Sequence, residues 1–116
     1  MRNLVCAAAT AALVLLSAGT AISAEPIEGT WLRPSTGTIV VFAGNGGKFC
    51  GTVQNGEFKG KSIGCMNGSG ADYKGSITDL KENKTFSGRA KITPAGMKLE
   101  GCVAMVLCKG EVWKRQ

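Results

Sequence analysis

The stretch TFSGRAKITPAGMKLEGCV, residues 85–103, gives the clearest indication of the fold. Apolar or small residues alternate with polar ones in its first half, and the alternation resumes after the sequence Pro94-Ala95-Gly96. A period of two is typical of a β-strand with one buried face, and a turn sequence between two such runs indicates a hairpin. The residues expected on the inner faces of the two strands are Phe86, Gly88, Ala90 and Ile92, followed by Met97, Leu99, Gly101 and Val103.

The rest of the chain after residue 25 has the same organisation. Short alternating runs are separated by turn sequences such as Gly44-Asn45-Gly46-Gly47, Asn55-Gly56 and Asn67-Gly68, and no segment shows a helical period. About eight strands result, which is the number in the smallest closed up-and-down barrel. A two-sheet sandwich is the alternative, but successive hairpins without a long crossover favour the barrel. We therefore expect an all-β protein, a small eight-stranded antiparallel up-and-down barrel.

The N-terminal segment, residues 1–24, has the features of a cleaved signal peptide. Its apolar run covers residues 4–16, and small residues precede candidate cleavage sites after Ser23 or Ala24. A transmembrane helix needs about 20 apolar residues, so we expect no membrane anchor. The sequence therefore predicts a single β-barrel domain, residues 25–116, that is periplasmic or secreted.

Four cysteines remain after the predicted signal peptide, and they favour a disulfide framework. The 116-residue chain carries a net charge of +6 and has five cysteines and no histidine. An even number of cysteines in a small exported domain is typical of disulfides, each worth about 2–3 kcal/mol. Four cysteines allow three pairings; we favour Cys50–Cys65 and Cys102–Cys108, because both close short loops. A zinc site is the rival, but the spacing lacks a CxxC knuckle, and we expect no metal.

Glycine recurs at one position of the predicted strands. In Phe49-x-Gly51-x-Val53 and in three later segments, a bulky residue, a glycine and an apolar residue share one face. Glycine weakens a strand, so the repetition has either a geometric cause, such as tight coiling of the barrel wall, or a functional one. The functional interpretation is an internal cavity for a small apolar ligand. The inward residues that we expect to bind it are Phe49, Val53, Tyr73, Ile77, Phe86 and Leu99.

Catalytic chemistry finds little support in the sequence. Without histidine there is no Ser-His-Asp triad and no histidine-ligated metal or haem. The acidic residues are scattered, no nucleophile elbow occurs, and the glycine-rich segment at 44–47 precedes no helix that could hold a phosphate. Aromatic residues make up only 6% of the chain, which argues against nucleic-acid binding. We expect no enzyme, no catalytic residue, no cofactor and no nucleic-acid partner; the oligomeric state is left open.

Two groups of segments resemble a bacterial exported family catalogued as domain of unknown function 2147. The first comprises Gly29-Thr30-Trp31-Leu32-Arg33-Pro34, the strand expected from Ile39 to Phe42, and Lys48-Phe49-Cys50-Gly51. The second runs from Tyr73-Lys74-Gly75 through Thr85-Phe86-Ser87-Gly88 to Leu99-Glu100-Gly101-Cys102 and Trp113-Lys114-Arg115. The resemblance implies a lipocalin-like barrel and no assigned activity. The Gly29-x-Trp31 motif is also similar to the one that opens lipocalins. That likeness implies that Trp31 closes one barrel end beneath Arg115, with Trp113 as a further aromatic residue of the barrel closure.

Two functions follow as expectations. The first is the binding of a small apolar ligand inside the barrel. The alternative is a periplasmic protein-binding module, such as an inhibitor or an envelope accessory protein, that acts through its loops. The stretch Val103-Ala104-Met105-Val106-Leu107 is the candidate apolar patch for a protein partner.

Overall fold

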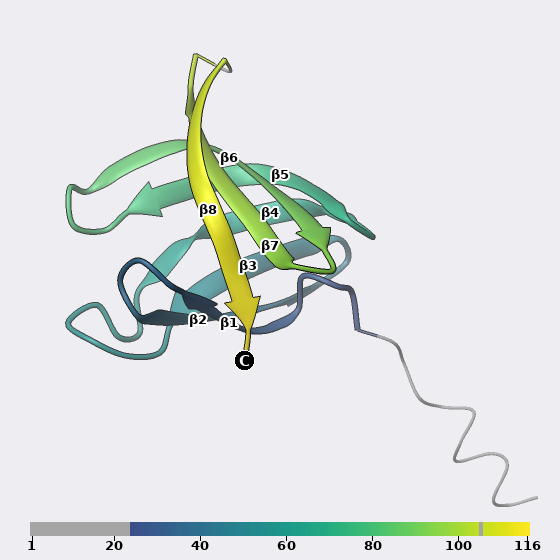
Figure 1. Ribbon diagram of the computed structural model, residues 1–116, viewed down its shortest axis with the longest axis horizontal. Coiled ribbons are helices and arrows are strands. Elements are labelled where there is room, and N and C mark those ends of the chain that lie inside the picture. Colours follow the sequence, from purple (N-terminus) through teal and green to yellow (C-terminus); the bar gives the residue numbers. More distant parts are fainter. Residues whose placement is uncertain (1–23, 105) are drawn as a thin grey trace, which may run out of the picture.

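The protein folds as a closed eight-stranded antiparallel barrel, seen in a computed structural model that describes residues 24–104 and 106–116 (Figure 1). Each strand pairs with the next along the chain, and β8 pairs with β1. The predicted all-β, up-and-down architecture is confirmed. Except for Ala24, the predicted signal peptide lies outside the described residues. The strands are β1 (Gly29–Arg33), β2 (Thr38–Asn45), β3 (Lys48–Val53), β4 (Ser62–Ser69), β5 (Asp72–Asp79), β6 (Lys84–Thr93), β7 (Gly96–Val103) and β8 (Leu107–Arg115).

The hairpin predicted from residues 85–103 is formed by β6 and β7. Ala90 lies opposite Leu99, and Gly88 lies opposite Gly101. Directly opposed residues of an antiparallel pair point to the same face, so all four belong to one face of the sheet. Ala90 and Leu99 are buried, which identifies this face as the inside of the barrel.

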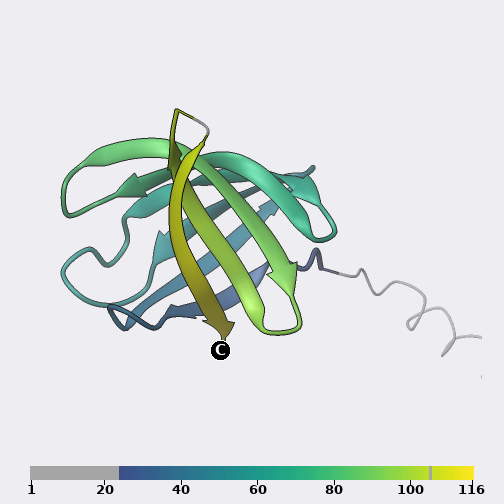
Figure 2. The ribbon, with the colours of Figure 1, turned by 45° about the horizontal axis from the view of Figure 1, so that its top comes forward.

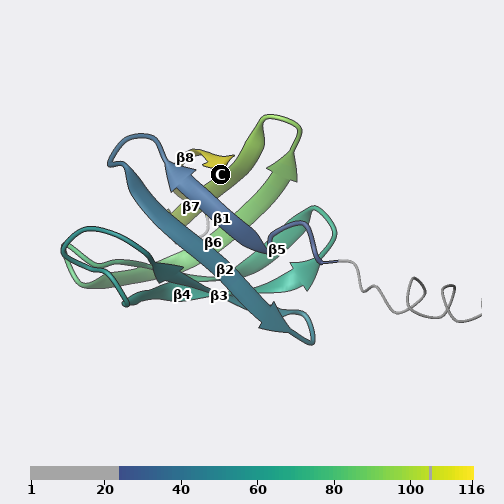
Figure 3. The ribbon, with the colours of Figure 1, turned by 90° about the horizontal axis from the view of Figure 1, so that it is seen from below.

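The connections between strands lie alternately at the two ends of the barrel (Figures 1 and 2). The β1–β2, β3–β4, β5–β6 and β7–β8 connections surround one end, which we call the open end. The other three connections and the C-terminus lie at the opposite, closed end. In Figure 3, β1 lies between β2 and the C-terminal end of β8, and the pairing of β1 with β8 closes the barrel.

Large side chains fill the closed half of the barrel. Phe49 and Tyr73 are each 1% exposed, and their rings meet edge to face with centroids 5.9 Å apart. This arrangement is the one that aromatic quadrupoles favour. Other buried side chains of the core include Ile27, Trp31, Phe42, Met66 and Met97. The closed half is therefore occupied by a packed core of buried side chains.

The space around the repeated glycines differs from one position to the next. Gly75, Gly88 and Gly101 lie opposite one another on β5, β6 and β7. A Cβ atom on Gly75 would lie 2.0 Å from the Cys65 carbonyl oxygen, and one on Gly88 would lie 2.5 Å from Cγ1 of Ile77. Neighbouring groups thus occupy the space, which supports the geometric interpretation for these two positions. Gly101 differs, because its Cβ would meet Phe86 only at 3.5 Å, an ordinary contact distance.

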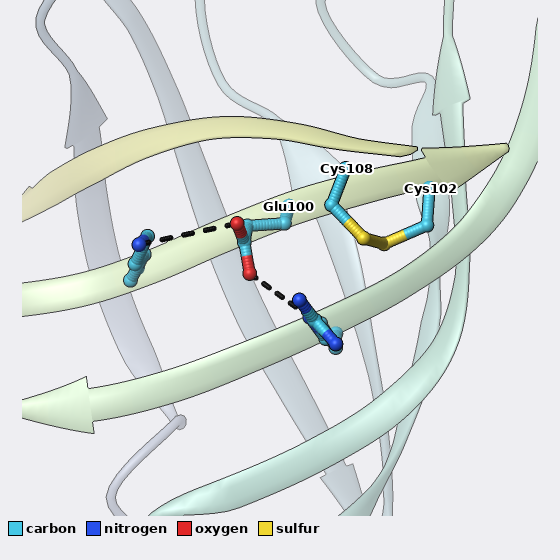
Figure 4. The surroundings of a disulfide bond; sticks show 5 residues. Glu100, Cys102 and Cys108 are labelled. Carbon is cyan, nitrogen blue, oxygen red and sulfur yellow. Dashed lines mark hydrogen bonds and ion pairs between the residues drawn. A yellow bond between two sulfur atoms is a disulfide. The ribbon is translucent and has the colours of Figure 1, made fainter. Parts of the chain in front are cut away.

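Both disulfides have the pairing that we favoured from the sequence. Cys50 lies opposite Cys65 on β3 and β4, and Cys102 lies opposite Cys108 on β7 and β8. The second bond spans six residues and fixes the base of the β7–β8 connection. Figure 4 shows it beside Glu100 on the outer face of the barrel. The dashed lines there mark the ion pairs of Glu100 with Arg89 at 2.9 Å and with Lys98 at 3.9 Å.

Candidate ligand-binding cavity

A cavity of about 1060 Å³ occupies the open half of the barrel. Its volume is slightly above the range of about 300–1,000 Å³ that is usual for small-molecule sites, and its walls combine a largely apolar interior with a polar mouth. The closed core forms its floor, and the four connections of the open end surround its mouth. The apolar side chains that line it are Val40, Val53, Phe58, Ile63, Ile77, Leu80, Phe86, Leu99 and Trp113 in the interior, with Val103, Val106 and Leu107 at the mouth.

Four of the six residues predicted to bind a ligand line this cavity: Val53, Ile77, Phe86 and Leu99. Phe49 and Tyr73 do not line it, because both belong to the closed core. Each of these two residues is the second of its strand and follows a turn at the closed end. Alternation predicts which face a residue occupies but not how deep along the barrel axis it lies, so the sequence could not separate the two groups.

A plug of one tryptophan and one arginine fills the closed end. Trp31 is 1% exposed, and its indole Nε1–H donates a hydrogen bond of 2.9 Å to the carbonyl oxygen of Ile27. The guanidinium carbon of Arg115 lies over the Trp31 ring, 4.0 Å from the centroid. Arg115 also donates to the carbonyl oxygens of Glu28 at 2.7 Å and Pro26 at 2.6 Å. The Arg115 guanidinium thus connects the Trp31 ring to residues 26–28, which precede β1 at the closed end.

Sequence reasoning missed a polar clasp, formed by Arg33, Ser35 and Glu111, at the seam between β1 and β8. These strands share only two residue pairs, and Glu111 lies beyond the last one. Its carboxylate accepts hydrogen bonds from Arg33 Nε at 2.9 Å, the Ser35 backbone N–H at 3.1 Å and the Ser35 hydroxyl at 2.6 Å. The clasp therefore connects β8 to the β1–β2 turn where the strand ladder has ended.

Strand parity predicts that the two charged residues of the clasp face inward, but it does not predict that they meet. Arg33 follows Trp31 at a spacing of two, and Glu111 precedes Trp113 at the same spacing. Each charged residue therefore shares a face with a core tryptophan, so both charges point into the barrel. The guanidinium carbon of Arg33 also lies 5.9 Å from the centroid of the Trp113 ring, within the range of a cation–π contact.

Two ionisable groups of the interior have shifted pKa values. Burial by itself would raise the pKa of Glu111, but the hydrogen bonds from Ser35 and the charge and hydrogen bond of Arg33 outweigh it, so the pKa lies below its ordinary value. Burial raises the pKa of Tyr73, whose hydroxyl donates to Glu25 Oε1 at 3.4 Å. At neutral pH the interior therefore holds an ionised Glu111 and a neutral Tyr73.

Two features are absent from residues 24–104 and 106–116, the part of the chain that the structure describes. No group of three or more potential metal-ligating side chains occurs in this part of the chain. No helix there has the length and apolar character needed to cross a membrane.

The fold and the cavity define a small antiparallel β-barrel with an internal cavity. A family model described as an uncharacterized protein conserved in bacteria (DUF2147) matches residues 60–115. The match confirms, over β4 to β8, the family resemblance that the sequence motifs predicted. The comparisons with curated proteins and with solved structures gave no match. A family without an assigned activity adds no function, so function has to be argued from the site itself.

Proposed function

We propose that the protein binds a small, predominantly apolar ligand in the open half of its barrel. The observation that carries this proposal is the cavity of about 1060 Å³, whose interior wall is apolar. A packed interior would have argued for a purely structural barrel or for action through the loops alone. The two disulfides support a place of action outside the cytoplasm, since such bonds persist in oxidising compartments.

We propose binding rather than catalysis because two acidic groups at the cavity mouth, Glu111 and Asp79, have structural partners. Glu111 is held in the clasp by three hydrogen bonds. Asp79 Oδ1 accepts hydrogen bonds from the backbone N–H groups of Lys81 and Glu82, as the capping residue of a turn does. Neither carboxylate is positioned as an unpartnered general base.

A steric block in the cavity tests the proposal. Gly101 lines the cavity, and a Cβ atom there fits at ordinary contact distance. We expect Gly101→Leu to occupy ligand space and to weaken binding of the neutral fluorophore N-phenyl-1-naphthylamine at least tenfold, about 1.4 kcal/mol. Gly101→Ala is the matched control and should bind nearly as the wild type does. Equal affinities for the leucine and alanine variants would contradict the proposed site.

The second candidate function, binding of a protein partner, is favoured by one observation. Among the described residues, Val103, Val106 and Leu107 are the large apolar side chains that are exposed, at 56%, 83% and 66%. All three lie at the β7–β8 connection, whose base the Cys102–Cys108 bond fixes. A cluster of exposed apolar side chains is typical of an interaction surface.

Val106→Ser separates this candidate from ligand binding, because the side chain is exposed and its replacement should leave the fold intact. A protein recovered from an envelope extract would support the candidate if its purified form binds the wild type more tightly than the serine variant. An identical affinity of the purified partner for both proteins would count against it. Because Val106 lies at the cavity mouth and not in its interior, its replacement should change the affinity for the neutral fluorophore far less than Gly101→Leu does.

A further inference from the structure

We propose that the ligand is an amphipathic anion, with its acidic head at Lys109 and its apolar part in the interior of the cavity. This inference rests on the proposed ligand-binding function and specifies the class of ligand. It follows from the polar groups at the cavity mouth: most of them are engaged with one another, and one inward-facing cation is left without a partner.

The strand register places Lys109 on the inner face of β8. It lies opposite Gly101, and Glu111 and Trp113 follow it at spacings of two on the same strand. All three residues of β8 line the cavity. The Lys109 side chain is exposed, as expected for a group at the mouth. Its alkyl stem can lie along the apolar wall while the ammonium group stays near water.

Three uncharged polar side chains at the mouth, Thr36, Thr38 and Asn55, are satisfied by neighbours. Asn55 Oδ1 accepts from the Ile39 N–H at 2.9 Å, and its Nδ2 donates to the Gly37 carbonyl at 3.1 Å. The hydroxyls of Thr36 and Thr38 lie 2.8 Å apart, in hydrogen-bond contact. These groups shape the mouth and leave little capacity to bind a ligand head group.

The ionised groups deeper in the mouth are likewise compensated. Glu111 lies two residues further into the barrel than Lys109 and would repel an anion if it were unpaired. Its charge is instead balanced by Arg33 at 2.9 Å and by the two hydrogen bonds from Ser35. The Arg33 guanidinium is in turn committed to Glu111 and to the face of Trp113. The clasp thus has no net charge to offer a ligand.

Three charged side chains that line the mouth have no hydrogen bond or ion pair among residues 24–104 and 106–116: Lys109, Lys81 and Glu57. Lys81 shares the β5–β6 turn with Asp79, which also lines the mouth and whose carboxylate has two backbone hydrogen bonds but no ion pair, so these two charges offset each other and Lys109 and Glu57 remain. In an eight-stranded barrel the β3–β4 loop, which carries Glu57, lies across the mouth from the β7–β8 connection, whereas the β5–β6 turn with Lys81 lies next to it. The side of the mouth at β8 therefore presents the unbalanced cation.

The depth of the wall sets the length of the apolar part. From Lys109 to Trp113 the strand advances four residues, about 13 Å at the rise of an antiparallel strand. An alkyl chain of medium length spans this depth from the ammonium group to the tryptophan floor. Along the way, the apolar side chains of the facing strands, such as Leu99 and Phe86, replace the water around it.

Calorimetric titration with dodecanoate and with dodecanol tests the inference, because the two probes share the chain and differ in the charge of the head. We expect the wild type at low salt to bind dodecanoate about three- to tenfold more tightly than dodecanol. Lys109→Met should remove this preference without weakening dodecanol binding, and Lys109→Arg should retain it. The matched control is Lys114→Met: this lysine lies on the same strand, opposite Leu32 and facing outward, and its loss should leave the preference intact.

The outcomes distinguish the inference from the function on which it rests. If the wild type binds both probes equally, or if Lys109→Met keeps the preference for dodecanoate, the inference is overturned while the apolar site remains. If neither probe binds, the proposed function fails and the inference fails with it. A preference that shrinks in 1 M salt and disappears only in the Lys109→Met variant would support the inference.

Discussion

Replacing Glu111 by glutamine breaks the clasp that holds the β1–β2 turn to β8 while keeping the size of the side chain. The carboxylate receives one charged and two neutral hydrogen bonds, from Arg33 and Ser35. A buried charged hydrogen bond contributes about 1.5–3 kcal/mol, but the Glu111 and Arg33 side chains are 27% and 46% exposed, so solvent reduces this value. The amide oxygen of glutamine can still accept one hydrogen bond. We therefore expect the free energy of unfolding at pH 7 to fall by about 1–2 kcal/mol.

The pH dependence of this loss gives a sharper test. The pKa of Glu111 is lower in the folded protein than in an unfolded chain. Such a group stabilises the fold above its unfolded pKa of about 4.3, and the stabilisation is lost as the pH falls through the folded pKa. Urea denaturation of the wild type and of Glu111→Gln should be compared from pH 7 to pH 3. The difference between their free energies of unfolding should be largest at neutral pH and should shrink below about pH 4. A difference that stays constant over this range, or that is absent at pH 7, would refute the role assigned to the ionised clasp.

Three further predictions concern the wall, the plug and the disulfides. Gly75→Ala should unfold the protein or lower its free energy of unfolding by several kcal/mol, because the added Cβ would lie 2.0 Å from a backbone oxygen. The control Gly101→Ala should change the midpoint of urea denaturation little. Equal losses of stability in the two variants would contradict the steric argument. Arg115→Met should lower the free energy of unfolding by about 1–3 kcal/mol, since the cation–π contact and two hydrogen bonds to carbonyls are lost; an unchanged thermal midpoint would show that the plug adds no stability. Replacing both Cys102 and Cys108 by serine should cost about 2 kcal/mol, less than the roughly 3 kcal/mol for the longer Cys50–Cys65 loop; the reverse order in denaturant unfolding would contradict the loop-entropy account.

The fold was predictable because each strand carries its own signal. The alternation in residues 85–103 defines a hairpin without reference to the rest of the chain, and the hairpins repeat in chain order. The disulfide pairing was also predictable. Short loops favour the bonds Cys50–Cys65 and Cys102–Cys108, and a meander brings just these cysteines opposite one another.

The candidate site was predictable only in part, because its limits depend on position along the barrel axis. Val53 and Phe49 have the same parity on β3, yet only Val53 lines the cavity. The seam between β1 and β8 was a second obstacle. It brings together residues from the two ends of the chain, so no local pattern places Glu111 beside Ser35.

The most direct test of the account locates a neutral ligand inside the barrel. Isotope-filtered nuclear Overhauser spectra of the labelled protein with unlabelled dodecanol report which protein methyl groups touch the alkyl chain. We predict contacts to Val53, Ile77 and Leu99, which line the cavity, and none to the Met97 methyl group in the closed core. Contacts confined to the outer surface, or none to the methyl groups of the open half, would contradict the claim that this half of the barrel is a binding site.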